Sequence, residues 1–179
     1  MKKILSFFLA AGTMLTAMGA APENLFPLPQ IQQNRSLGEG AGKWHRTYVN
    51  PANVTAKLAV DADGTLDILR EGKPGASSWR INLTGLAAKF YTLDTSVTCS
   101  DKALIDIYAF NAAGKAKLIY LKRIPKTDAR EICETFEVPE GTVKVRFGFG
   151  VENNGSASYR MPRLFAGLFS PETLPPREK

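Results

Sequence analysis

Between Tyr91 and Leu164, apolar and polar residues alternate in runs that Gly, Pro or Asn residues separate. The clearest run is 142–151, whose apolar side chains all fall on the same face: Val143, Val145, Phe147, Phe149 and Val151. A period of two bounded by turn formers is typical of antiparallel strands with one buried face. Because a slip of one residue would expose the whole set, we expect this run to be a core strand.

Shorter alternating runs lie on either side of this strand, and no stretch after residue 20 keeps the 3.6-residue period of an amphipathic helix. An Asp63-Gly64 pair between two of these runs indicates a hairpin. Regularly spaced strands with turn signals imply a sandwich of roughly nine or ten strands. The predicted fold is therefore all-β, a two-sheet antiparallel β-sandwich of the jelly-roll type.

Residues 1–20 have the pattern of a secretory signal peptide: Lys2 and Lys3, an apolar run, then small residues. We expect export to the periplasm or the cell exterior, with no transmembrane segment in the mature chain. The remaining residues of the 179 suit one domain. We predict an exposed lead-in over 21–43, the β-sandwich domain over 44–169 and a disordered tail over 170–179.

The basic residues of the chain are scattered along the sequence. The formal net charge of +6 falls to +4 when the two lysines of the signal peptide are removed. A nucleic-acid-binding surface needs tighter clustering with interleaved aromatic residues, so we expect no nucleic-acid partner. Weak attraction to acidic polysaccharides remains compatible with this charge.

Cys99 and Cys133 are the two cysteines of a chain that we expect to be exported. An oxidising compartment favours a disulfide bond between them. Cys99 has the same phase as the apolar residues of its run, whereas Cys133 is out of phase with Phe136. At least one of the two should therefore lie at a strand end or a bulge.

Several motifs occur in a familiar order: 79–83, 90–97, 105–114, 136–141 and 155–164. Together they resemble the carbohydrate-binding modules that have the galactose-binding-domain-like jelly-roll fold, over residues 44–169. That family usually carries acidic residues, often associated with a structural calcium, where this chain has Arg160 and Met161. Calcium needs several hard oxygen ligands, so we predict no metal site.

The polar faces of the long strands supply the predicted binding site. By alternation, Asp106 and Tyr108 point away from the core in one run, Arg146 does so in another, and Asp94 in a third. Carboxylate, guanidinium and aromatic groups on one face suit sugar recognition. The alternative is an ordinary solvated sheet face with cross-strand ion pairs.

Two further aromatic residues are possible sugar contacts. Trp44 lies near a loop and could be either a stacking platform or a core residue, and Tyr120 is out of phase with its apolar neighbours Ile119 and Leu121. We predict both as ligand contacts. Trp79, which shares phase with Ile81, is expected in the core.

The sequence offers little for catalysis. His45 is the only histidine, so zinc binding and histidine-based nucleophilic catalysis lack ligands and partners. A glycoside hydrolase would have to pair Asp94 with Asp106 as acid and nucleophile. We therefore expect no enzyme activity and no cofactor.

These observations predict an exported, non-catalytic carbohydrate-binding β-sandwich, acting alone or as an accessory to polysaccharide degradation. The alternative is a protein–protein interaction or envelope-assembly module with the same fold and no sugar ligand.

Overall fold

A computed structural model describes residues 21–27, 42–48 and 54–177 of the chain. Every helix or strand in these ranges is a β-strand. The strands are β1 (Trp44–Tyr48), β2 (Val54–Val60), β3 (Leu66–Gly72), β4 (Ala76–Thr84), β5 (Phe90–Cys99), β6 (Lys102–Asn111), β7 (Ala116–Ile124), β8 (Thr127–Glu137), β9 (Thr142–Glu152) and β10 (Gly155–Ala166). The predicted signal peptide lies outside the described residues.

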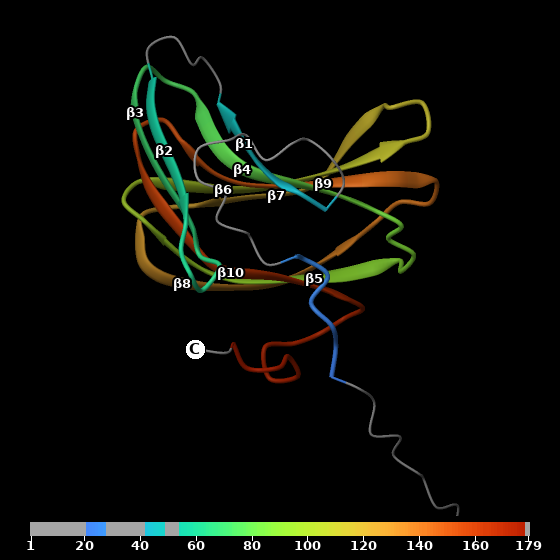
Figure 1. Cartoon of the computed structure of the whole chain (residues 1–179). Helices are drawn as coiled ribbons and strands as arrows, with labels where there is room; N and C mark the ends of the chain where they lie inside the picture. Colours follow the sequence, from blue (N-terminus) through green and yellow to red (C-terminus); the bar gives the residue numbers. More distant parts are fainter. Residues whose placement is uncertain (1–20, 28–41, 49–53, 178–179) are drawn as a thin grey trace, which may run out of the picture.

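The strands form two five-stranded antiparallel sheets that pack face to face (Figure 1). One, here called the β9 sheet, has the order β1-β4-β9-β6-β7; the other, the β10 sheet, has the order β2-β3-β10-β5-β8. Each is named after its middle strand. The prediction of an all-β, two-sheet antiparallel sandwich is confirmed.

The core lies between the sheets, and β9 supplies its centre. Val145, Phe147, Phe149 and Val151 are at most 1% exposed, as the alternation predicts. Val143 is 50% exposed, so its prediction as a core residue is wrong. It precedes Lys144, the last β9 residue that pairs with β4. Val143 therefore lies beyond the β4–β9 pairing, at the end of the β9 sheet.

Part of the segment predicted as an exposed lead-in contributes to the core. Phe26 is 3% exposed, and its ring centroid lies 4.9 Å from that of Phe147. The backbone N–H of Leu25 donates to the carbonyl of Leu164 at 2.8 Å. The Asn24 side chain accepts a bond from the Leu164 N–H at 2.9 Å. This segment therefore closes the core beside β10.

The predicted disulfide is absent: Cys99 and Cys133 are both free thiols. Cys133 pairs with Asp94, five positions before Cys99 on β5. Five strand residues span about 17 Å, whereas the Cα atoms of a disulfide lie within about 7 Å. The thiols also lie on opposite faces, because Cys99 is in the core and Cys133 is opposite the outward-facing Asp94. This placement on opposite faces explains why Cys99 is in phase with the apolar residues of its run and Cys133 is not.

Candidate functional site

The outer face of the β9 sheet brings together three of the predicted site residues. Cross-strand pairing places Asp106 beside Gly148, and Gly148 beside Arg80. In the next row along the strands, Tyr108 lies beside Arg146. The row after that pairs Phe110 with Lys144. Strands β6 and β9 are neighbours although they are distant in sequence, and this neighbourhood assembles the site.

Asp106 lies in the floor of this face. The residue is 6% exposed, and its Oδ1 has no hydrogen-bond partner in the described parts of the chain. A Cβ on Gly148 would lie 2.7 Å and 2.8 Å from the two carboxylate oxygens, so only glycine leaves them this space. Burial raises the pKa of Asp106, against the opposing pull of Arg80 and Arg146. The result is a buried carboxylate with spare acceptor capacity.

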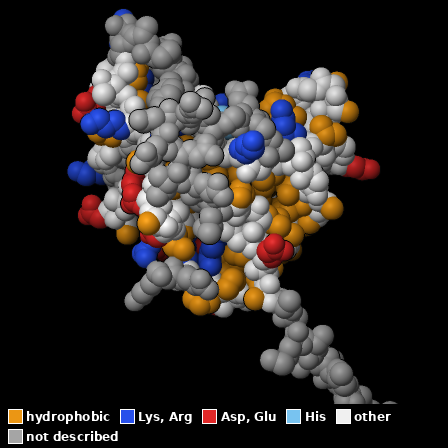
Figure 2. All heavy atoms as spheres, in the orientation of Figure 1, with side chains coloured by type: hydrophobic (Ala, Val, Ile, Leu, Met, Phe, Trp, Pro, Cys, Tyr) orange, Lys and Arg blue, Asp and Glu red, His pale blue; other side chains and the backbone are white. Residues whose placement is uncertain are grey.

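Cations cover the aromatic rings beside this carboxylate. The guanidinium carbon of Arg146 lies 4.9 Å from the ring centroid of Tyr108 and 5.1 Å from that of Phe110. The Lys144 ammonium lies 4.4 Å from the Phe110 ring. These distances are those of cation–π interactions. Figure 2 shows Lys or Arg side chains next to hydrophobic ones near the β6–β7 hairpin.

The edge strand β7 adds apolar side chains to the same face. Leu121 pairs with Asp106, Leu118 pairs with Tyr108, and each leucine is 42% exposed. The β6–β7 hairpin stands up at one end of the face (Figure 1). The face therefore mixes one carboxylate, several cations and apolar surface.

Trp44 is a core residue, so its prediction as a ligand contact is wrong. It is 3% exposed and its ring centroid lies 5.4 Å from that of Phe26 and 5.7 Å from that of Phe149. Its indole N–H donates to the Pro27 carbonyl at 3.0 Å. No surface of this ring is left on which a sugar could stack.

Tyr120 is also not on the site face, and its prediction as an exposed contact is wrong. A bulge between Ile107 and Tyr108 shifts the β6–β7 register, so Tyr120 pairs with the core residue Ile107. Its hydroxyl donates to Glu134 of β8 at 2.8 Å. Burial raises the pKa of Tyr120 to about 12. The residue thus joins the edges of the two sheets.

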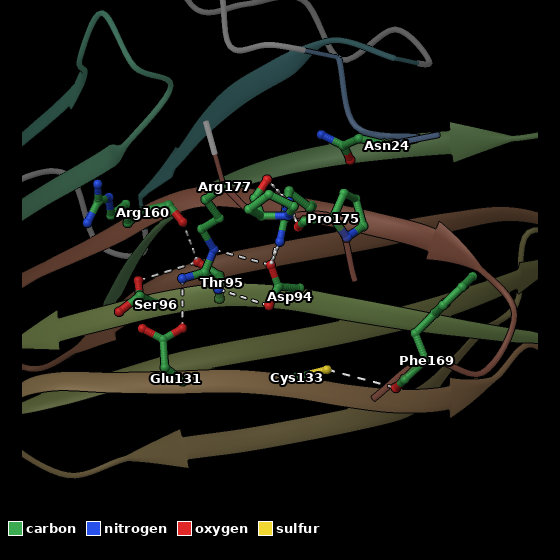
Figure 3. A network of polar contacts seen from close by, with 12 residues as sticks. Asn24, Asp94, Thr95, Ser96, Glu131, Cys133, Arg160, Phe169, Pro175 and Arg177 are labelled. Atoms are coloured by element: carbon green, nitrogen blue, oxygen red, sulfur yellow. Dashed lines mark hydrogen bonds and ion pairs between the residues drawn. The ribbon is translucent and has the colours of Figure 1, made fainter. Parts of the chain in front are cut away.

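Asp94 lies on the outer face of the opposite sheet, where Arg163 and Arg177 bind it. Figure 3 shows Asp94 with Arg177. A bulge in β10, at which Met161 has a φ of 42°, brings Arg163 into register with Asp94. The Arg163 Nε donates to the Asp94 carboxylate at 2.9 Å, and the Arg177 side chain donates at 2.9 Å and 3.2 Å. Asp94 is therefore a structural ion-pair residue.

The C-terminal segment was predicted as a disordered tail, but its described part, 170–177, contacts the β10 sheet. Arg177 binds Glu131 of β8 at 2.7 Å as well as Asp94. The Arg163 side chain donates to the carbonyls of Pro175 at 2.7 Å and Pro176 at 3.2 Å. These bonds hold the segment against the outer face of the β10 sheet.

The geometry rules out Asp94 and Asp106 as the acid and nucleophile of one glycosidase site. Asp94 and Asp106 face outward from different sheets, and packed sheets alone are about 10 Å apart. The two carboxylates of a glycosidase lie within about 10 Å across one shared cleft. These two aspartates cannot act on the same bond.

Sequence reasoning missed Arg80 and Gly148. Both could have been found by phase, since Arg80 alternates with Trp79 and Ile81 and Gly148 shares the phase of Arg146. The sequence does not show that β4 and β6 both pair with β9, which is what places Arg80 and Gly148 beside Asp106.

Two wider properties concern the described residues as a whole. Among them there is no group of three or more His, Cys, Asp or Glu side chains that could hold a metal ion. They also contain no helix long and apolar enough to cross a membrane.

Comparison with known proteins identifies the fold. No protein-family model and no curated protein matches the sequence. Solved structures do match. The family 11 carbohydrate-binding module of Lic26A-Cel5E from Clostridium thermocellum has 15% identity and a TM-score of 0.53, with 86% of this chain and 99% of that one covered. The CBM22-1 xylan-binding domain of Xyn10C from Paenibacillus barcinonensis has 11% identity and a TM-score of 0.51, with 85% and 99% covered.

The enzymatically active domain of tailspike protein 4 from bacteriophage CBA120 is also similar, with 13% identity and a TM-score of 0.57. The match covers 77% of this chain but only 21% of that one. At these identities the likeness is one of fold. The chain has the β-sandwich fold of carbohydrate-binding modules, and the resemblance predicted from its motifs is confirmed.

Proposed function

We propose that this chain is an exported, non-catalytic carbohydrate-binding protein that takes its glycan on the outer face of the β9 sheet. One observation carries the proposal: the buried carboxylate of Asp106 keeps an unpartnered oxygen within the described structure, packed against Gly148 beside Arg80, Arg146 and Tyr108. A buried acceptor without a partner costs stability. A ligand hydroxyl that donated to it would remove that cost.

The surrounding groups suit a sugar. A carboxylate accepts hydrogen bonds from sugar hydroxyls, and guanidinium groups donate to ring and hydroxyl oxygens. Exposed Leu118 and Leu121 offer apolar surface for the C–H groups of a pyranose. The fold shared with carbohydrate-binding modules supports the same conclusion.

Binding without catalysis is supported by the separation of Asp94 from Asp106 on different sheets. Export is supported by the signal-peptide pattern of residues 1–20. An accessory role in polysaccharide degradation would follow from these properties.

The test is a glycan-binding assay on the purified exported protein, by array and then by calorimetry. Asp106→Asn should weaken binding about 10- to 100-fold, the effect of losing one hydrogen bond to a charged group. Asp101→Asn, at an exposed position between β5 and β6, is the matched control and should bind normally. Equal affinity of the two variants would contradict the proposed site. Absence of glycan binding with capture of a stable protein partner would favour the interaction-module alternative.

A further inference from the structure

The charges on the site face are unbalanced. Across β4, β9 and β6, three successive rows hold the cations Arg80, Arg146 and Lys144 against the single carboxylate of Asp106. The remaining partners in these rows include no Lys, Arg, Asp or Glu: His45, Asn82, Thr84, Leu118, Leu121 and Ala116. Such a face has a local positive potential, which attracts anions.

One other acid on this face is paired with a cation. Glu152 lies at the far end of β9, and the Arg123 side chain binds its carboxylate at 3.1 Å. It therefore leaves the excess of cations in these three rows unchanged. The described residues of these three rows therefore carry a net positive charge.

Cations of β9 lie over the aromatic rings of β6 on this face. Tyr108 pairs directly with Arg146, Phe110 pairs directly with Lys144, and each cation lies over its partner's ring. A neutral pyranose that stacked on these ring faces would have to displace the cation. The rings are therefore better suited to holding the cations in position than to stacking a sugar.

A guanidinium held against aromatic rings is well prepared to bind an oxyanion. Its planar donors match carboxylate and sulfate groups, and a fixed side chain loses less freedom on binding. Arg146 lies over two rings, and Lys144 is two residues before it on the same face. Neighbouring positions on one strand face are about 7 Å apart, so both cations can reach one saccharide unit or adjacent units.

We propose that the glycan bound on this face is anionic, with its carboxylate or sulfate groups held by Arg146 and Lys144 and a hydroxyl donating to Asp106. This inference rests on the proposed function and names its ligand class. The shared chemistry is that of an oxyanion on a sugar.

The experiment compares matched glycans. Several backbones (glucan, galactan and mannan) are each offered as the neutral polymer, as the polymer oxidised at C6 to uronate, and as its sulfated form. Binding to at least one anionic form should be at least about ten-fold tighter than to its neutral parent, and should weaken about ten-fold or more between 50 and 500 mM NaCl, because salt screens exposed charges. The uronate and sulfate arms separate the two sources of charge.

Variants assign the effect to this face. Arg146→Gln and Lys144→Gln should each lower affinity for the anionic glycan about ten-fold or more. Lys57→Gln, an exposed lysine of β2 on the other sheet, removes the same charge and should have no such effect. Circular dichroism checks folding, and Lys144→Gln decides the matter if Arg146→Gln does not fold.

The outcomes separate this inference from the proposed function. Binding of neutral polymers alone would overturn the anionic class and leave the carbohydrate-binding function intact. Failure to bind any polymer would overturn both. Equal binding of the anionic glycans and of double-stranded DNA, or an equal loss in Lys57→Gln, would show general attraction to polyanions and would also overturn the inference.

Discussion

Tyr159 joins the two sheets at the base of the site, which makes Tyr159→Phe an informative perturbation. The residue points inward from β10, is fully buried, and reaches the backbone of the β9 sheet. Its hydroxyl accepts bonds from the N–H groups of Leu104 at 3.0 Å and Gly150 at 3.1 Å. The carbonyls of the same two residues are within reach of its proton. Leu104 and Gly150 form the row next to Asp106 and Gly148.

The expected loss follows from burial. Phenylalanine fills the same volume, so the variant creates almost no cavity. The deleted oxygen leaves backbone polar groups of Leu104 and Gly150 with one partner fewer in a dry core, where an unsatisfied group costs about 1–3 kcal/mol. We expect a loss near the middle of this range, about 2 kcal/mol, which lowers the melting temperature of a domain of this size by about 4–8 °C.

Urea unfolding followed by fluorescence measures this loss. The midpoint should fall while the m-value stays constant, since the surface exposed on unfolding is unchanged. Tyr108→Phe removes a hydroxyl from a half-buried position on the outer face and is the matched control, with an expected change below about 0.5 kcal/mol. Equal midpoints for Tyr159→Phe and the wild type would refute the role assigned to this hydroxyl.

Three further predictions concern the two outer faces. Gly148→Ala places a Cβ 2.7 Å from the Asp106 carboxylate, which must then move. Calorimetry should therefore show that the glycan affinity is reduced by about ten-fold. Unchanged affinity would mean that this carboxylate does not contact the ligand. Burial raises the folded-state pKa of Asp106 above 3.8, so the stability of the wild type should increase relative to Asp106→Asn as the pH falls through that raised pKa, and level off below 3.8. Melting curves from pH 7 to pH 3.5 test this sign, and a relative loss of stability on acidification would contradict it. Arg177→Gln breaks the bonds to Asp94 and Glu131 and should speed amide hydrogen exchange in residues 170–176. The free energy of unfolding should fall by only about 1 kcal/mol, because Arg163 still pairs with Asp94. Unchanged exchange would show that other contacts hold the segment.

The sequence was most informative where one face of a strand is fully buried. The alternation in β9 and β6 predicted which residues point inward, because register errors there would expose several large apolar side chains at once. The same parity placed Asp106, Tyr108 and Arg146 outward, as the structure has them. That they share one face depends on β6 pairing with β9, a long-range contact that no local pattern encodes.

The predictions failed where the structure departs from simple alternation. The bulge in β7 pairing turned Tyr120 inward, and a bulge is not visible in an alternating run. Phe26 belongs to a segment without any period, yet it fills the core beside Trp44. The disulfide was inferred from an expected compartment and an even number of cysteines, and parity was the better guide to Cys133.

The contrast between Asp94 and Asp106 supports the outer face of the β9 sheet as the proposed binding face. Both carboxylates are 6% exposed and both lie on an outward strand face. Two arginines saturate Asp94, one of them supplied by the C-terminal segment that lies over the β10 sheet. Asp106 has two arginines near enough to influence its pKa, yet one of its oxygens has no hydrogen-bond partner in the described structure. A buried carboxylate that is already paired with two arginines has little acceptor capacity left for a ligand. One whose bonding is incomplete costs stability, and a ligand on the outer face of the β9 sheet could complete it.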